Sequence, residues 1–239
     1  MTSSHKNKKK VAILQSNYIP WKGYFDLINL VDEFVIYDDV QYTKNDWRNR
    51  NKIKTPKGLL WLSIPVETSG RLTNTRLIRE TKIVQKNWNK KHWNSILLNY
   101  SKAGYFPDYK DIFEELYLNC NSEYLSEINF SLLKGINSLL GIKTRLSQSN
   151  EYDLSGGQTE RLLSICKKLN ADEYISGPAA RNYIKESFFE QENIKLTWMD
   201  YSGYPEYNQM YPPFEHSVSI IDLIFNEGPN CKKFMKSFN

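Results

Sequence analysis

VAILQSNYIPWKGYFDLINLVDEFVIYDDV (residues 11–40) contains a complete strand–helix–strand pattern. Residues 11–15 and 33–40 are apolar runs typical of buried strands, and residues 21–31 carry apolar side chains at helical spacing. Pro20 suits the entry to that helix, because its fixed φ is helical and its missing N–H is no loss there. Two strands joined by one helix are typical of a parallel sheet, so this stretch predicts an α/β fold.

The rest of the chain extends this pattern and interrupts it once. Further strands are predicted at 59–66, 142–149, 172–177 and 194–201, a helix at 156–170, and a last helix that begins after Ser217 as its N-cap. Three helical patterns, at about 80–103, 108–120 and 122–140, follow one another without a strand between them. We therefore expect a single Rossmann-like α/β domain over 11–229 with a helical insertion at about 80–141, a disordered basic tail at 1–10 and a second tail at 230–239.

Composition excludes several classes of protein. A chain of 239 residues can bury a sizeable core without metals or disulfides, and no run approaches the roughly 18 apolar residues of a membrane helix. The lysine-rich start lacks the apolar stretch of a signal peptide, so we expect a cytoplasmic protein without membrane insertion. The three cysteines share no CxxC spacing, which predicts free thiols and no zinc site.

The charge and the aromatic content bear on the partners. A net charge of +5, partly from lysines in residues 6–10, gives no indication of a nucleic-acid partner, and a homo-oligomer stays open. The 16 tyrosines and 6 tryptophans often stand beside amides and cations, where their rings can form walls for sugars or nucleobases. The alternative is that most of these rings cap a small core.

The first polar cluster follows the first strand, at the edge of a parallel sheet where ligands bind. It contains Gln15, Asn17 and Tyr18 as candidate substrate-binding residues, with Gly23 in the first helical turn. The structural alternative is that Asn17 caps the helix while Gly23 allows close packing.

The second cluster follows the second strand. Asp38 and Asp39 are candidate catalytic residues, since adjacent carboxylates can act as a base, bind magnesium or pair with arginines. Lys44, Arg48 and Arg50 have the chemistry to clamp a phosphate or carboxylate. Tyr42, Asn45 and Asn49 complete the candidate substrate-binding residues of this segment. The alternative is a surface loop with its own salt bridges.

Two weaker candidates lie further along the chain. Ser176, Gly177 and Arg181 follow a predicted strand and could form an anion nest, although no Rossmann or P-loop glycine fingerprint is present. His216, beside an aromatic loop, is a candidate proton shuttle, while a lone histidine is more often structural. No pattern predicts a metal site formed by histidines or cysteines.

Four segments resemble one family. QSNYIPWKGYFDLI, FVIYDDVQYTKNDWRNRNKIKTPKGLLWLSIPV, YISGPAARNYI and SIIDLIFNEGP are similar to the WbqC-like proteins of bacterial surface-polysaccharide gene clusters, with a match from Val11 to Pro229. The resemblance implies a role in making or modifying a sugar of O-antigen lipopolysaccharide or of a capsule, and it carries over no catalytic residue set. QSNYIPWKGY also resembles, by shape alone, the HxGH-bearing turn of nucleotidyltransferase-type Rossmann domains, but both histidines are absent.

The leading hypothesis combines this resemblance with the polar clusters. It is a transferase that moves an acyl or aminoacyl group, from acyl-CoA or another donor, onto the amine of a nucleotide-linked sugar, with Asp38 or Asp39 accepting the amine proton. The alternatives are a nucleotide-dependent ligase or nucleotidyltransferase using ATP with magnesium on these aspartates, and a non-catalytic glycan-binding protein. All three require the turn ending at Pro20 and the segment 38–51 to meet at one rim, facing a shared hollow.

Overall fold

The computed structural model describes residues 8–67 and 76–238 of the chain. Its centre is a parallel sheet of five strands in the order β5-β2-β1-β6-β7. The strands are β1 (Lys10–Leu14), β2 (Glu33–Ile36), β5 (Arg145–Gln148), β6 (Glu173–Ser176) and β7 (Lys195–Trp198). Numbered along the chain within this sheet alone, the order is 3-2-1-4-5, so strand order reverses between β1 and β6. The predicted Rossmann-like α/β fold is confirmed, and this reversal is where such sheets bind ligands.

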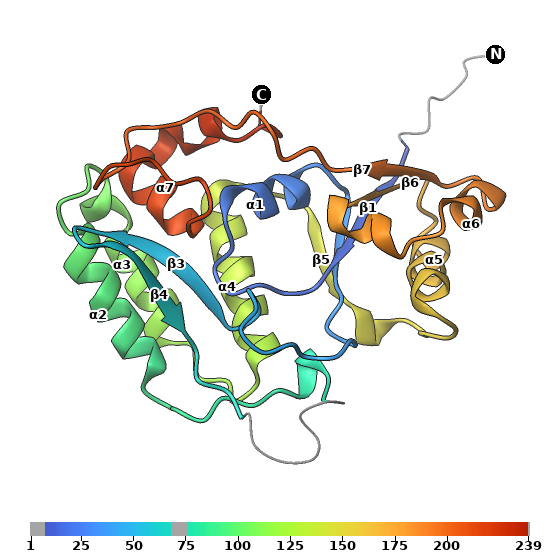
Figure 1. Ribbon diagram of the computed structural model, residues 1–239, viewed down its shortest axis with the longest axis horizontal. Helices are drawn as coiled ribbons and strands as arrows, with labels where there is room; N and C mark the ends of the chain where they lie inside the picture. Colours follow the sequence, from blue (N-terminus) through green and yellow to red (C-terminus); the bar gives the residue numbers. More distant parts are fainter. Residues whose placement is uncertain (1–7, 68–75, 239) are drawn as a thin grey trace.

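Helices cover both faces of the sheet (Figure 1). The helices outside the insertion are α1 (Lys22–Asn29), α5 (Gln158–Lys168), α6 (Glu186–Gln191) and α7 (Ile220–Glu227), with short 3-10 helices at Ser149–Glu151, Pro178–Asn182 and Gly228–Phe234. One further short 3-10 helix, Ile78–Glu80, lies between β2 and β5. Because side chains alternate along a strand, Ala12 packs into a core shared with α1 and α7, whereas its neighbour Val11 packs into a second core with α5 and α6. The result is a three-layer domain.

Everything between β2 and β5 forms the insertion. It contains the helices α2 (Trp88–Tyr100), α3 (Phe106–Leu118) and α4 (Leu125–Leu140). The three predicted helices are therefore present, although α2 begins at Trp88 and not at about residue 80. It also contains an antiparallel hairpin of β3 (Arg50–Thr55) and β4 (Gly58–Ser63), so the predicted strand at 59–66 pairs outside the central sheet. The insertion therefore begins well before residue 80.

Both ends of the domain are packed, which corrects the two predicted tails. Residues 1–7 lie outside the described residues, but Lys10 belongs to β1, and Lys9 forms an ion pair of 3.1 Å with the buried Glu33. At the other end, Met235 is fully buried and the backbone N–H of Lys236 donates to Asp26 at 2.8 Å. Residues 9–10 and 230–238 are thus part of the fold.

The last helix also begins later than predicted. Its N-cap is Ser219, whose hydroxyl accepts from the backbone N–H of Ile221 at 3.3 Å, and not Ser217. Cys120, Cys166 and Cys231 are all buried free cysteines. Over residues 8–67 and 76–238, no helix combines the length and the apolar character needed to cross a membrane.

Candidate functional site

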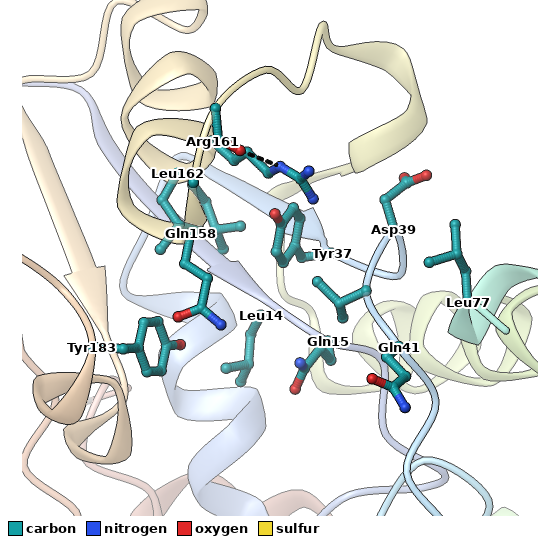
Figure 2. Close-up of a pocket in the computed structure, with 14 residues that line it drawn as sticks. Leu14, Gln15, Tyr37, Asp39, Gln41, Leu77, Gln158, Arg161, Leu162 and Tyr183 are labelled. Atoms are coloured by element: carbon teal, nitrogen blue, oxygen red, sulfur yellow. Dashed lines mark hydrogen bonds between the residues drawn. The ribbon is translucent and has the colours of Figure 1, made fainter. Parts of the chain in front are cut away.

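A cavity of about 520 Å³, here called the switch-point cavity, opens at the carboxyl ends of β1 and β2. Figure 2 shows side chains from the turn after β1, the loop after β2, the start of α5 and the segment after β6 converging on it. Its lining residues are Ile13, Leu14, Gln15, Tyr37, Asp39, Val40, Gln41, Leu77, Gly156, Gly157, Gln158, Arg161, Leu162 and Tyr183. A mostly preformed hollow with a few converging polar groups at this place is typical of a ligand site.

One wall of the cavity favours an anion. Gly156 and Gly157 precede α5, whose first turn carries free backbone N–H groups and no side-chain cap from its N-cap Gly157. Gly156 needs to be glycine because its φ is +86°. The guanidinium of Arg161 donates to the Gly156 carbonyl at 3.0 Å. It also lies close to Tyr37. Burial raises the pKa of the Tyr37 phenol, and the positive charge of Arg161 opposes that rise. Arg161 therefore adds a fixed positive charge to the helix start.

Asp39 places a negative charge across the cavity from this wall (Figure 2). Its carboxylate accepts from the hydroxyl of Ser149 at 2.6 Å and pairs with the guanidinium of Arg79 at 2.5 Å. The side chain is 12% exposed, so it is oriented by these two contacts and still reaches the cavity. A positioned carboxylate of this kind can bind an ammonium group or accept a proton.

Asp38, the other predicted catalytic aspartate, faces a different environment. It is 3% exposed, accepts from the backbone N–H of Ser16 at 2.9 Å and from the hydroxyl of Ser126, and is not among the residues that line the switch-point cavity. Burial raises the pKa of this carboxyl, although both hydrogen bonds oppose that rise. Asp39 therefore lines the cavity, while Asp38 is held by Ser16 and Ser126. Within residues 8–67 and 76–238, no group of three or more His, Cys, Asp and Glu side chains is arranged to hold a metal ion.

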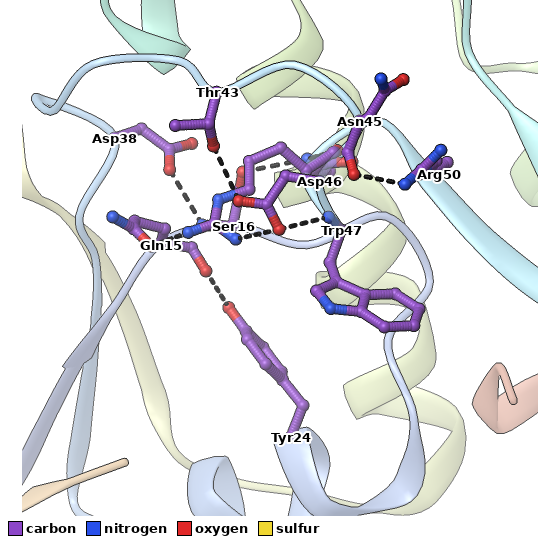
Figure 3. Close-up of polar contacts among 11 residues, drawn as sticks. Gln15, Ser16, Tyr24, Asp38, Thr43, Asn45, Asp46, Trp47 and Arg50 are labelled. Carbon is purple, nitrogen blue, oxygen red and sulfur yellow. Dashed lines mark hydrogen bonds and ion pairs between the residues drawn. The ribbon is translucent and has the colours of Figure 1, made fainter. Parts of the chain in front are cut away.

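The turn ending at Pro20 and the segment 38–51 lie side by side, as Figure 3 shows for their polar groups. The backbone N–H of Tyr18 donates to the carbonyl of Trp47 at 2.9 Å, and the guanidinium of Arg48 donates to the Gln15 side chain. Gln15 and Asp39 line the switch-point cavity, whereas Asn17 and Trp47 line a second cavity of about 220 Å³. Residues of both segments line each cavity, so the two segments face shared hollows as expected, although there are two of these hollows and not one.

The predicted cationic clamp does not converge on one anion. Arg48 pairs with Asp46 at 3.0 Å, while the Arg50 guanidinium stacks over the Trp61 ring at 4.4 Å. Lys44 is exposed, and none of the three lines the switch-point cavity. The predicted sugar-binding amides do not line it either: Asn45 is exposed, and the side chain of Asn49 donates to the Ile64 carbonyl at 2.9 Å.

Two predicted substrate-binding tyrosines belong to the core. Tyr42 is 7% exposed, and Tyr18 is fully buried, with its hydroxyl 2.7 Å from Nδ1 of His92 and 3.0 Å from the hydroxyl of Tyr117. Nε2 of His92 lies 3.2 Å from the Ser63 carbonyl, an acceptor, so the imidazole carries its proton on Nε2 and accepts from Tyr18 on Nδ1. This chain of bonds anchors the turn after β1 to α2 and α3.

The two weaker predicted sites lie away from the switch-point cavity. Ser176 is 2% exposed and accepts from the hydroxyl of Tyr174 at 3.2 Å, and the Arg181 guanidinium lies 5.3 Å from the Trp198 ring centre. Ser176, Gly177 and Arg181 do not line the cavity, but Tyr183 from the same segment does. His216 lines neither cavity, and its ring packs edge-on against Phe214 at 4.6 Å.

Several lining residues were not among the sequence-based candidates: Tyr37, Gly156, Gly157, Gln158, Arg161 and Tyr183. Two adjacent glycines in front of a helix, with an arginine four residues after the second, were a usable signal for an anion site. This glycine pair lacks the spacing of the Rossmann and P-loop fingerprints, so those patterns do not identify it.

The buried His92 leads to a prediction about stability. Burial lowers the pKa of His92 to about 4, whereas an unfolded histidine titrates near about 6.5. The unfolded chain therefore binds more protons between these values, so the free energy of unfolding should fall as the pH drops from about 6.5 toward about 4. Going from about pH 7 to about pH 5, the contribution is on the order of 2 kcal/mol. Urea unfolding of His92→Gln should show a correspondingly shallower pH dependence, and an unchanged slope would contradict the assignment.

Comparison with known proteins identifies the family of this chain. A model of the WbqC-like protein family matches residues 15–234. The chain belongs to the WbqC-like protein family. Uncharacterized protein Rv1507c of Mycobacterium tuberculosis is 50% identical to this WbqC-like chain over 228 residues, which is 95% of this chain and 98% of that protein. No solved structure gives a significant match. Membership in the WbqC-like family supports a function related to polysaccharide biosynthesis.

Proposed function

We propose that this chain is a transferase that binds a nucleotide-linked amino sugar in the switch-point cavity and acylates or aminoacylates the amine of the sugar. The observation that carries the proposal is the polarity of the cavity, with Arg161 and the start of α5 on one wall and Asp39 on the other. A nucleotide-linked amino sugar has the matching polarity, because its phosphates are anionic and its amine is basic. The family's link to polysaccharide biosynthesis supports the same substrate class.

Binding follows from the wall chemistry. The diphosphate would accept from the free N–H groups in the first turn of α5 and from the Arg161 guanidinium, both suited to phosphate oxygens. The amides of Gln15, Gln41 and Gln158 line the space between the walls and can pair with hydroxyls or with a nucleobase edge. The ring of Tyr183 gives a flat apolar surface at the rim.

Asp39 would serve the transfer step. The sugar amine attacks the carbonyl carbon of a thioester donor such as acyl-CoA, forming the C–N bond as the C–S bond breaks. Asp39 accepts the proton that the nitrogen loses, and the departing thiolate takes up one proton, so the products are the amide and the free thiol. Ser149 and Arg79 hold Asp39 in place during this exchange.

A second candidate function draws on the same anion wall. The phosphates of ATP also fit a helix start beside an arginine, so an ATP-dependent ligase remains the competing proposal. Thermal unfolding with a ligand panel separates the two. The panel contains a nucleotide-linked amino sugar, the same nucleotide sugar with a hydroxyl in place of the amine, acyl-CoA, and ATP with magnesium.

The transferase predicts that the amino sugar nucleotide stabilises the chain more than its hydroxyl analogue does. A ligand present at about 100 times its dissociation constant adds roughly 2.7 kcal/mol, which is a readily measured shift. Stabilisation by ATP alone would favour the ligase. Stabilisation by free glycans alone would favour the non-catalytic binding protein.

Replacing Glu160 by glutamine is expected to tighten binding of the sugar nucleotide. Glu160 lies in the first turn of α5, and a Cβ added at Gly157 would be 2.8 Å from its Oε2 atom, so its negative charge is close to the anion wall. Glu160→Gln should tighten binding of the sugar nucleotide about twofold to fivefold, since such exposed charge interactions amount to roughly 0.5–1 kcal/mol. Isothermal titration checks this, with Glu190→Gln as the charge-matched control. Weaker binding in Glu160→Gln would instead give Glu160 a direct ligand contact.

A further inference from the structure

The second cavity has no part in the proposed transfer reaction. It has a volume of about 220 Å³ and is lined by Asn17, Pro20, Trp21, Trp47, Asn51 and Ser217, so we call it the Trp47 cavity. It lies between the turn after β1, the loop before β3, β3 itself and the segment before α7. Since a water molecule in the liquid occupies about 30 Å³, the volume suits one six-membered ring with small substituents and not a nucleotide.

Two indoles and a proline ring form apolar walls. The indole of Trp21 lies against Gly23, so closely that a Cβ added at residue 23 would be only 2.3 Å from the indole ring. The same indole contacts the ring of Tyr201 edge-on, with ring centres 5.3 Å apart. Trp47 packs against Trp61 with ring centres 5.4 Å apart. Both indoles can therefore present flat surfaces to a ring, Trp21 from a packed position and Trp47 from a position that is 39% exposed.

One polar atom of a residue that lines this cavity has no hydrogen-bond partner within the described part of the chain. Oδ1 of Asn17 is buried and makes no hydrogen bond. A buried acceptor left unpaired costs about 1–3 kcal/mol, which a ligand donor would recover. The neighbouring backbone is strained, because Ile19 has a φ of +36°, and the Asn51 amide fixes it by donating to the carbonyls of Tyr18 at 3.1 Å and Ile19 at 2.7 Å.

The two charged groups bonded to the lining residue Ser217 are the Lys52 ammonium, which also lies 5.8 Å from the centre of the Trp47 ring, and the Glu215 carboxylate. Ser217 accepts from the Lys52 ammonium at 2.9 Å and donates to the Glu215 carboxylate at 2.6 Å, and none of the six lining residues is charged. This surrounding favours a neutral ligand, because a charged one would find no opposite charge among the lining residues.

From these observations we infer that the Trp47 cavity binds one neutral pyranose ring. The apolar C–H face of the sugar would lie against the indole of Trp47, and one hydroxyl would donate to Oδ1 of Asn17. A purely apolar ring leaves Asn17 unpaired, so a ligand that combines an apolar face with hydroxyl donors fits both features of the cavity. The inference is independent of the transfer reaction, since it uses none of the residues that line the switch-point cavity.

Saturation-transfer NMR with a panel of neutral methyl hexopyranosides tests it. We expect saturation of the ring C–H protons in the native chain, affinity reduced about threefold to tenfold in Asn17→Ala through loss of one hydrogen bond, and loss of the signal in Trp47→Ala. Trp47→Phe, which keeps a flat ring, should retain binding, and Asn182→Ala, an exposed asparagine away from the cavity, should match the native chain.

Three results would overturn the inference. In the first, no hexoside binds to the native chain. In the second, Asn17→Ala binds hexosides as tightly as the native chain does. In the third, indole or benzyl alcohol binds although every hexoside fails to bind. Arg161→Gln should bind the hexosides as the native chain does, so a failure of the proposed transferase leaves this result unaffected.

Discussion

Replacing Arg161 by glutamine is expected to weaken binding of the nucleotide-linked sugar about 10-fold to 100-fold, with little change in the stability of the free chain. Arg161 is the lining residue that adds positive charge beside the first turn of α5. Charge-assisted hydrogen bonds contribute roughly 1.5–3 kcal/mol, which corresponds to that range of affinities. Within the protein, its guanidinium makes a hydrogen bond to the Gly156 carbonyl at a half-exposed site, so the fold depends little on it.

The matched control is Lys168→Gln, which removes one positive charge from an exposed position on the same helix. Isothermal titration of the two variants separates a local contact from a general effect of net charge. Equal weakening in both variants would show that the ligand senses only the overall charge. Unchanged affinity in Arg161→Gln would remove Arg161 from the phosphate site.

Asp39→Asn is expected to lower the rate of acyl transfer by about 10²–10⁴, the usual contribution of a positioned general base. Asparagine keeps the shape of the side chain and can still accept from Ser149, but it cannot take up a proton. The lost ion pair with Arg79 is partly exposed, so its effect on stability should stay within about 1 kcal/mol. Single-turnover measurements by mass spectrometry, with sugar nucleotide and acyl-CoA both saturating, follow the amide product directly.

Asp46→Asn is the control for this substitution. Asp46 also pairs with an arginine, Arg48, and lies on the same segment, but it does not line the switch-point cavity. It should transfer at the native rate. If Asp39→Asn transferred the acyl group at the same rate as Asp46→Asn, the carboxylate of Asp39 would have no part in proton transfer.

The fold was largely predictable because its first strands are apolar and contiguous. β1 overlaps the predicted run 11–15 and β2 lies within the predicted run 33–40, since both faces of each strand are covered and apolar runs follow from that. β3 was not predicted because RNKIKT is mostly polar. Its inward positions include Asn51, which holds the turn after β1, and Lys54, whose ammonium is buried against the Pro213 carbonyl. The sequence of β3 does not show that these two polar side chains have partners in the turn after β1 and at Pro213, so it does not indicate a buried strand.

The site was predictable only where it follows directly from strand ends. Gln15 and Asp39 follow β1 and β2 closely, so the rule that ligands bind at carboxyl ends of strands identified them. Asp38 and Asp39 are adjacent in the sequence, so the sequence does not separate their roles. The structure shows that Asp38 accepts a hydrogen bond from Ser16, whereas Asp39 lines the switch-point cavity. Arg161 lies on α5, the helix that connects β5 to β6 and is far from Tyr37 in the sequence. Its position close to Tyr37 depends on this connection, which the sequence alone does not show.

A crystal structure of the chain with a nucleotide-linked amino sugar tests the central claim most directly. We expect the diphosphate within hydrogen-bonding distance of Arg161 and of the backbone N–H groups in the first turn of α5, with the sugar amine directed at Asp39. Density for the nucleotide outside the switch-point cavity, or a diphosphate that contacts neither Arg161 nor α5, would contradict the proposed site.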